Sequence, residues 1–418
     1  MSGLSIGVIC GALVAVAGTP TTTSQEFGRA VFSARGDLQP YRSLSPDEKA
    51  AFELGQQVFN SHFVPTGTPG AGRLAGLGPL HNAPSCDACH NDGARGRGPA
   101  GDGEVPASLV MQLGHVLPAG GEIQPDLAYG RTLNTNGANG VKPEGRVFVH
   151  YQEMTGHFPD GSEWHLRVPH YELRDLAYGP VAETTVLMPR IAPAIYGAGL
   201  LEAAQLAPES RSRFGWQGAS VSVRDQTTKA FAREMGVTSA DVPSDDCTAL
   251  ELDCRSLPNA GPEISDDLLI ALASFERLLA VPSVAREDDV RDGKIFVAIG
   301  CAGCHTPSLP VSFSKQGSGS ESYIHAYTDL RLHDLGVGLA DRTFAGRIVS
   351  SRWRTAPLWG VGYRPRPNLP LTFLHDGRAR SIVEAVLWHD GEGRTARRKF
   401  ETLGAADREA LERWILGL

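Results

Sequence analysis

Apolar residues recur at helical spacing in four stretches of this 418-residue chain. Ser45 can cap a helix, Pro46 suits its first turn and Glu48 can complete a capping box, so a helix is predicted to begin there. Its inward positions would be Phe52, Val58 and Phe59. Three further helices are predicted over residues 220–235, 265–279 and 406–416. These stretches favour a chain that is mainly α-helical.

The pattern changes to alternation of apolar and polar residues between about residues 129 and 178. Residues 147–151 and 164–168 alternate, and the Pro-Asp-Gly at residues 159–161 between them is typical of a turn. We therefore predict a β-hairpin inserted into a helical domain. The insertion holds four histidines, His150, His157, His165 and His170. Exposed strand positions account for them, and a second metal site is the alternative.

An apolar run over residues 4–18 is followed by small and polar residues. The run is shorter than the roughly 20 residues that a membrane-spanning helix needs. We therefore expect residues 1–24 to be a secretory signal peptide, with cleavage somewhere between residues 17 and 23. The mature protein would be periplasmic and would not span the membrane.

Composition and charge narrow the class of protein. A hydrophobic share of 41% and a charged share of 21% are typical of a soluble globular chain, and the length suits two or three units with their own cores. The 48 glycines and 28 prolines indicate long, specifically shaped loops between short elements. A net charge of -8 gives no reason to expect nucleic-acid binding.

The pattern Cys-x-x-Cys-His occurs at residues 86–90 and again at residues 301–305. Two thiols at this spacing can share one turn and add to the two vinyl groups of one porphyrin, which places the next histidine to ligate the iron. The residues concerned are Cys86, Cys89, His90, Cys301, Cys304 and His305. A zinc site made of the four thiolates is the alternative, but it would not need a histidine after each pair. We therefore predict two covalently bound c-type haems, whose maturation also indicates export.

Two cysteines remain once haem takes four and Cys10 falls in the predicted signal peptide. Cys247 and Cys254 are close enough in sequence to close a small loop as a disulfide, which an oxidising compartment permits. Two free thiols are the alternative. Nothing in the sequence around Cys247 and Cys254 indicates a redox-active dithiol.

Three segments of the first half recur in the same order in the second half. The paired segments are 55–59 with 293–296, 190–193 with 354–357, and 216–219 with 375–378. A shared order of motifs is the mark of an internal repeat. The chain is therefore predicted to hold two cytochrome c-like haem domains of common plan, residues 25–284 and 285–418, the first enlarged by the β insertion.

The order of these motifs resembles the bacterial di-haem peroxidase superfamily, which includes the di-haem cytochrome c peroxidases and the methylamine-utilisation di-haem oxidases. Within it the chain is similar to the branch called di-haem oxidoreductases, sometimes labelled thiol oxidoreductases. The resemblance covers nearly the whole mature chain. The segments that carry it are residues 77–82, 190–193, 214–216, 327–334, 353–360, 373–379 and 388–389.

The resemblance implies roles for particular residues. Trp216 would lie between the haems and relay electrons, and Gln226 and Glu234 would face the open side of the His90 haem. His389 stands where the peroxidases place the far axial ligand of the electron-transfer haem, so that iron would have two histidine ligands, a set expected to lower its potential relative to a methionine ligand. Glu234 is the expected acid for peroxide cleavage, with Glu153, Glu163 and His115 as further candidates.

The expected function is a periplasmic di-haem oxidoreductase that takes electrons at the C-terminal haem and uses them at the N-terminal haem to reduce peroxide or oxidise a substrate. Its electron donor would be a small cytochrome or a copper protein. The resemblance also allows calcium between the domains, bound through Asn82. The alternative is an electron-transfer protein with two six-coordinate irons and no catalysis, because an iron with two strong protein ligands can only pass electrons.

Overall fold

A computed structural model describes residues 38–116, 122–206, 212–258, 261–282, 290–313, 322–366 and 368–418. The predicted signal peptide, and the predicted boundary at residues 284 and 285, lie outside these ranges, so the division into residues 25–284 and 285–418 stays a prediction. Within the described residues, no helix is both long enough and apolar enough to cross a membrane.

The prediction of a mainly α fold with two helical, cytochrome-like domains is wrong. Of the described residues, 28% are helical and 23% are in strands, and the strands form several small sheets. Most of the strands outside the hairpin have only two or three residues. Buried backbone N–H and C=O groups need partners, and here short strands supply them where helix does not.

The predicted helices of the first half are confirmed. They are α2 (Pro46–Asn60), α4 (Val223–Glu234) and α6 (Asp266–Leu278), joined by the short α3 (Ala198–Glu202) and α5 (Leu252–Arg255). The Ser45 hydroxyl accepts a hydrogen bond from Glu48 N while the Glu48 carboxylate accepts one from Ser45 N, which completes the capping box. Helices α2 and α6 pack through Phe275, whose ring centroid lies 5.1 Å from that of Phe52 and 5.3 Å from that of Phe59.

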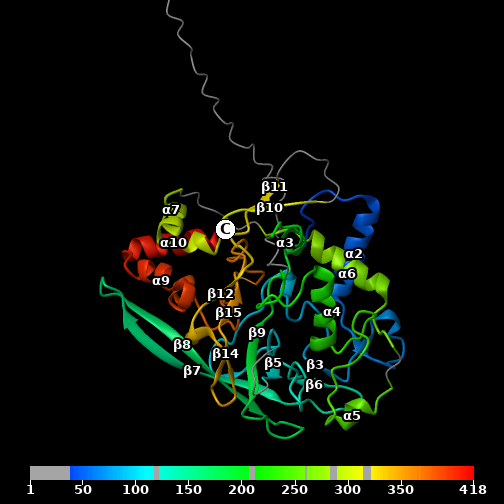
Figure 1. Ribbon diagram of the computed structural model, residues 1–418. Helices are drawn as coiled ribbons and strands as arrows, with labels where there is room; N and C mark the ends of the chain where they lie inside the picture. Colours follow the sequence, from blue (N-terminus) through cyan, green and yellow to red (C-terminus); the bar gives the residue numbers. More distant parts are fainter. Residues whose placement is uncertain are drawn as a thin grey trace, which may run out of the picture.

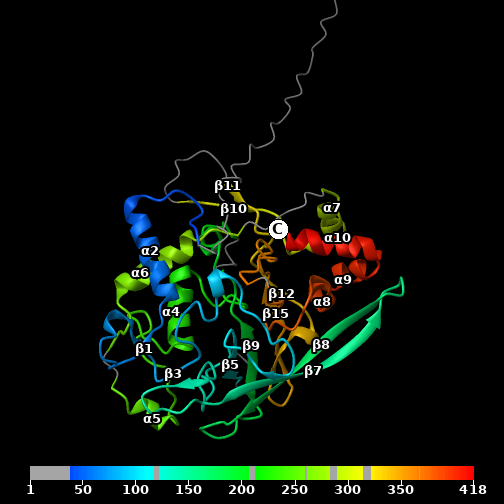
Figure 2. The same cartoon turned by 180° about the vertical axis from the view of Figure 1, so that it is seen from behind.

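The second half carries its own helices around a separate apolar core. They are α7 (Val290–Ile299), α8 (Ile382–Leu387), α9 (Arg394–Glu401) and α10 (Ala405–Leu416), the last confirming the C-terminal prediction. Phe296, Phe400, Leu411 and Trp414 are buried in this core. Figures 1 and 2 show the two helical groups at opposite ends of the molecule, with most strands between and below them.

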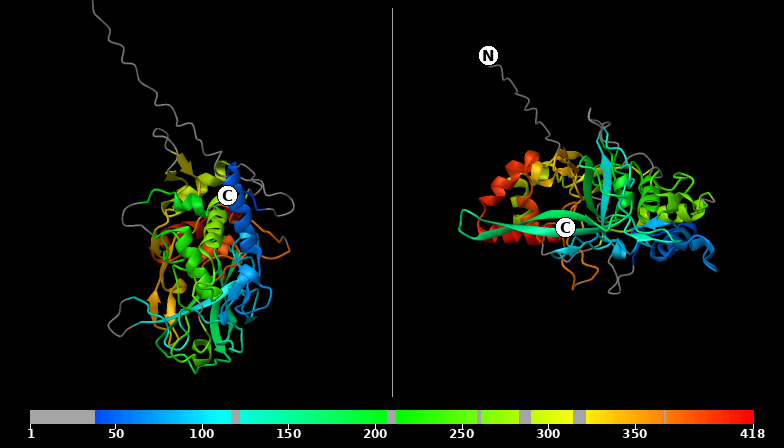
Figure 3. Two further views of the ribbon diagram at one scale, coloured as in Figure 1. Left: turned by 90° about the vertical axis from the view of Figure 1, so that its right-hand side faces the viewer. Right: turned by 90° about the horizontal axis from the view of Figure 1, so that it is seen from below.

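The predicted hairpin is confirmed, but it does more than enlarge the first half. Strands β7 (Arg146–His157) and β8 (Glu163–Arg174) pair along their whole length. Figure 3 shows the hairpin running across to the C-terminal helices. At its tip, the Phe158 ring meets that of Phe400 at 6.3 Å, and Arg408 Nη2 donates to Asp160 Oδ2 at 2.7 Å. The hairpin therefore packs its tip on the second half of the chain.

A four-stranded sheet also joins the two halves. Its strand order is β14 (Ile348–Ser350), β13 (Asp341–Thr343), β9 (Thr185–Ile191) and β5 (Leu109–His115). The pairing of β13 with β9 is backed by a buried ion pair in which both Arg190 terminal nitrogens donate to Asp341, at 2.8 and 2.6 Å. The remaining strands are β1 (Val64–Pro65), β2 (Ala75–Leu77), β3 (Leu80–His81), β4 (Gly103–Glu104), β6 (Asn136–Gly137), β10 (Leu309–Val311), β11 (Ser322–Ile324), β12 (Leu332–Asp334) and β15 (Arg352–Arg354).

Two smaller expectations can be checked. The disulfide between Cys247 and Cys254 is confirmed. The four histidines of the hairpin are exposed, and in the described part of the chain they do not gather into a group that could hold a metal ion.

The close packing of α2 on α6 generates a test at Gly55. A Cβ added there would lie 2.1 Å from the Ala271 carbonyl oxygen. Alanine favours a helix over glycine by about 1 kcal/mol, yet here it forces the helices apart, so we expect Gly55→Ala to lower the free energy of unfolding by about 1–3 kcal/mol. Thermal unfolding beside Gly101→Ala, where an added Cβ meets nothing within 4 Å, checks this. Equal midpoints for the two variants would contradict the packing.

Candidate haem sites

The first Cys-x-x-Cys-His segment forms a single turn against a cavity. The amide of His90 donates to the Cys86 carbonyl at 2.9 Å, and the amide of Cys89 donates to the same oxygen at 3.2 Å. Cys86, Cys89 and His90 line a cavity of about 1270 Å³, part of it open to solvent. The same cavity is lined by Trp216, Gln226 and Glu234, so the structure brings together the residues expected at the first haem.

The second segment repeats this local structure at the other cavity. The amide of His305 donates to the Cys301 carbonyl at 2.9 Å. Cys301, Cys304 and His305 line a cavity of about 1340 Å³, part of it open to solvent, and His389 lines it too. His389 follows α8, whose Ser381 cap accepts a hydrogen bond from Glu384 N, so the helix start fixes where the histidine emerges.

Hydrogen bonds hold three histidines in the tautomer that can bind iron through Nε2. The Nδ1 atom of His90 lies 2.7 Å from the Pro193 carbonyl, that of His305 lies 3.0 Å from the Tyr327 carbonyl, and that of His389 lies 2.7 Å from the Ala385 carbonyl. Because a carbonyl only accepts, each Nδ1 must donate, which leaves Nε2 with its lone pair. Such an outer hydrogen bond is typical of metal-ligating histidines. The donor set therefore fits two haem irons.

Two arginines beside the cavities lack an acidic partner. Arg354 is buried, and its guanidinium donates only to the carbonyls of Gly215 and Thr355 among the described residues. Arg95 has no hydrogen bond or ion pair in the described part of the chain and lies over the Phe373 ring at 4.9 Å. Burial lowers the pKa of Arg354 to about 10 and also lowers the pKa of Arg95. Buried cations without anions are costly, and haem brings two propionates that can neutralise them.

Trp216 lines both the cavity at His90 and the cavity at His305. Its indole Nε1 donates to the Ile191 carbonyl at 2.8 Å, and its own carbonyl accepts from Arg354 N at 2.9 Å. These bonds fix the ring between segments from the two halves.

The sequence profile of the family described as "Di-haem oxidoreductase, putative peroxidase" matches residues 191–418, more than half of the chain. The chain belongs to this family. One solved structure, Kuenenia stuttgartiensis hydrazine synthase pressurised with 20 bar xenon, aligns over 99% of this chain and 100% of its own, with a TM-score of 0.41 and 12% identity. A comparison with curated proteins finds no match.

In this di-haem oxidoreductase, Glu234 is a half-buried carboxyl on the wall of the first cavity. It closes α4, and its Oε2 accepts a hydrogen bond from Asn82 Nδ2 at 3.1 Å. Burial raises the pKa of Glu234 to about 7, although the bond from Asn82 and the charge of Arg233 oppose that shift. A carboxyl with this pKa exchanges a proton near neutral pH, which suits general acid–base chemistry.

Sequence reasoning missed a second carboxyl at the same cavity. Glu276 lines the space at His90, accepts a hydrogen bond from the Thr227 hydroxyl, and has a pKa raised to about 7 by burial. It follows Leu272 by four residues on the apolar face of α6, so a charged residue on that face was the available signal. The further candidates Glu153 and Glu163 are exposed on the hairpin, and none of Glu153, Glu163 and His115 lines the cavity at His90.

Asn82, the residue expected to bind calcium, is engaged with protein groups. Its Oδ1 accepts from Thr135 N at 3.1 Å and from the Thr135 hydroxyl at 3.2 Å, while its Nδ2 donates to Glu234. Asn82 thus holds the Glu234 carboxyl, and calcium at Asn82 stays a prediction.

This arrangement predicts that Asn82 lowers the pKa of Glu234. In Asn82→Ala the carboxylate loses a donor, so its pKa should rise and a larger fraction should be protonated at pH 7. The infrared C=O band of the protonated carboxyl, assigned by its loss in Glu234→Gln, reports this by pH titration. Asn139→Ala is the control, because Asn139 donates only to the exposed Thr66 carbonyl. An unshifted titration in Asn82→Ala would show that the bond has no influence on Glu234.

Proposed function

We propose that this chain is a periplasmic, peroxidase-like enzyme with two covalently bound c-type haems. Electrons enter at the haem of the second half and pass to the haem at His90, which reduces peroxide or oxidises a substrate. Membership of the di-haem oxidoreductase family supports the chemistry. The disulfide between Cys247 and Cys254 supports export, because such bonds persist in oxidising compartments.

The observation that carries the proposal is the difference between the two cavities. The cavity at His305 also offers the imidazole of His389, so an iron there can have two strong protein ligands. The cavity at His90 offers Gln226 and the half-buried carboxyls of Glu234 and Glu276, and among the described residues no second histidine lines it. One cavity thus suits electron transfer and the other suits a reaction that moves protons.

Haem with an open coordination position, held by Cys86, Cys89 and His90, would supply the iron that binds peroxide and donates electrons to it as the O–O bond is cleaved. The residues of the chain handle the protons. Ionised Glu234 takes the proton from one oxygen of peroxide and gives it to the other oxygen, which leaves as water. Reduction of one peroxide to two waters takes up two electrons and two further protons. Asn82 holds the Glu234 carboxylate in place throughout.

Trp216 is the proposed relay between the haems, supported by its place on the walls of both cavities. The proposed donor is a small cytochrome or a copper protein of the periplasm. If the enzyme oxidises a protein or a small molecule instead, that reaction would use the same cavity and the same carboxyl.

Electron paramagnetic resonance and visible spectra of the exported protein test the proposal first. As isolated or half-reduced, it should show one low-spin iron and one high-spin iron, and hydrogen peroxide should change only the high-spin signal. Two low-spin signals that peroxide leaves unchanged in every redox state would instead identify a non-catalytic electron-transfer protein.

Glu234→Gln tests the proton-handling step. Since the carboxylate must be ionised to take the first proton, peroxide consumption by the wild type should rise with pH through about 7. The variant should lose this limb and turn over about 10²–10⁴ times more slowly. Glu172→Gln, an exposed residue of β8, is the matched control and should keep both rate and pH profile. A Glu234→Gln variant with an unchanged profile would assign the step elsewhere, with Glu276 as the next residue to replace.

His389→Ala tests the proposed second ligand of the other iron. Removing the imidazole should convert the low-spin signal of the second half to high-spin while the His90 haem keeps its spectrum. His325→Ala, a histidine bonded to Ser308 and outside both cavities, serves as control. A low-spin signal that survives in His389→Ala would place the ligand elsewhere.

A further inference from the structure

A pair of buried carboxyls lies apart from the haem cavities. Glu144 is 1% exposed and Glu251 is 0% exposed, and their side chains contact each other. Neither residue lines the cavity at His90 or the cavity at His305. The amide of Asn134 donates to Glu144, and the amide of Thr248 donates to Glu251. Backbone groups from two distant segments thus hold the carboxyls face to face.

In the described part of the chain, neither carboxyl of this pair forms an ion pair with a Lys, Arg or His. Burial and mutual repulsion raise the pKa of Glu144 well above its usual value, and burial raises that of Glu251. Two adjacent acids without a counter-charge are costly unless they share a proton or bind a cation.

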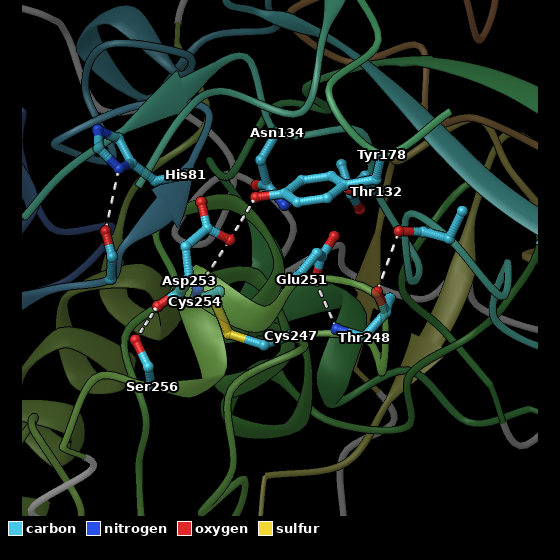
Figure 4. The surroundings of a disulfide bond; sticks show 12 residues. His81, Thr132, Asn134, Tyr178, Cys247, Thr248, Glu251, Asp253, Cys254 and Ser256 are labelled. Atoms are coloured by element: carbon cyan, nitrogen blue, oxygen red, sulfur yellow. Dashed lines mark hydrogen bonds between the residues drawn. A yellow bond between two sulfur atoms is a disulfide. The ribbon is translucent and has the colours of Figure 1, made fainter. Parts of the chain in front are cut away.

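Unpartnered oxygens surround the same place. Among the described residues, Thr132 Oγ1, Asn134 Oδ1 and Glu251 Oε1 are buried without a hydrogen-bond partner. Figure 4 shows these three side chains gathered beside the ring of Tyr178, near the Cys247–Cys254 disulfide. The Asn134 Nδ2 lies against the Glu144 carboxyl and also donates to the Thr132 carbonyl at 3.2 Å. Turning that amide over would aim Oδ1 at the pair in exchange for the bond to Thr132. Each buried oxygen left without a partner is costly unless something binds it.

We propose that Glu144, Glu251, Asn134 Oδ1 and Thr132 Oγ1 form a Ca²⁺ site. All the donors are oxygens, which select a hard cation. Two bidentate carboxylates, one amide oxygen and one hydroxyl supply six ligand atoms, within the six to eight that Ca²⁺ takes. The two negative charges balance the ion. Mg²⁺ is a poorer match because it keeps several waters, and these donors are almost fully buried.

The neighbouring sulfurs do not change the choice of metal. Cys247 and Cys254 lie within 4.8 Å of a Glu251 oxygen, but they are joined to each other and cannot act as thiolate ligands. The disulfide instead braces the loop that carries Thr248 and Glu251. This site is distinct from Asn82, whose side chain is already bonded to Thr135 and Glu234.

Metal analysis and thermal unfolding of the full exported protein with both haems test the site. After treatment with EGTA and addition of CaCl2, we expect one Ca²⁺ per chain and a rise of about 5 °C in the unfolding midpoint, with little response to MgCl2. Calorimetric titration with CaCl2 should show affinity roughly tenfold weaker in Thr132→Val and no binding in Glu251→Gln. Thr155→Val and Glu163→Gln, exposed residues of the hairpin, are matched controls.

Three results would overturn the proposal. Equal midpoints in CaCl2, MgCl2 and EGTA would mean that Glu144 and Glu251 share a proton instead. A bound Ca²⁺ whose affinity is the same in Thr132→Val, Glu251→Gln and the wild type would lie elsewhere in the protein. An equal response to MgCl2 would assign a different ion. If Glu251→Gln fails to fold, Thr132→Val alone decides, because it keeps the shape and charge of the site.

Discussion

The hydrogen bonds around Trp216 and Ile191 hold the centre of this molecule together. Ile191 N donates to the His375 carbonyl at 2.7 Å, and the Ile191 carbonyl accepts from the Trp216 indole at 2.8 Å. The Trp216 carbonyl in turn accepts from Arg354 N. These residues belong to four of the six recurring segments, 190–193, 216–219, 354–357 and 375–378. The internal repeat is thus a junction in which each half supplies backbone partners to the other.

The junction explains why the two cavities share a wall. Trp216 lines both cavities and Arg354 lines the cavity at His305. Arg190, paired with Asp341, lies 4.6 Å from the centre of the Trp353 ring, which stacks on His375 at 3.8 Å. A wall made of bonded backbone and stacked rings can be thin without exposing polar groups. A change at Asp341 or Trp353 would therefore disturb both haem sites together, because their common support is a single buried layer.

Structure that depends on neighbouring residues could be predicted from the sequence, whereas the pairing of distant segments could not. The capping box at Ser45, the turn at residues 159–161, the Cys247–Cys254 disulfide and the two turns that carry His90 and His305 all depend on neighbours within a few residues, and each forms as expected. The pairing of β9 with β13 and the packing of the hairpin on Phe400 join residues more than 100 positions apart, for which alternation along the chain holds no signal. Strands of two or three residues are also too short to show a period, which is why the chain read as mainly α.

The lack of a signal for long-range contacts also explains why Glu276 and Glu144 were not predicted as functional residues. Glu276 differs from a surface residue only in lying on the apolar face of α6, and Glu144 looks like an ordinary surface residue until the fold shows what covers it. An isolated acid has no periodic pattern. The fold also reveals a connection between two of these sites. Asn134 contacts Glu144, its neighbour Thr135 donates to Asn82, and Asn82 donates to Glu234. Residues 134 and 135 therefore link the proposed cation site to the acid at the first haem cavity through three hydrogen-bonded contacts. Ordering of this segment by a cation would reach Glu234 through Asn82, because the position of the Asn82 amide is fixed by Thr135.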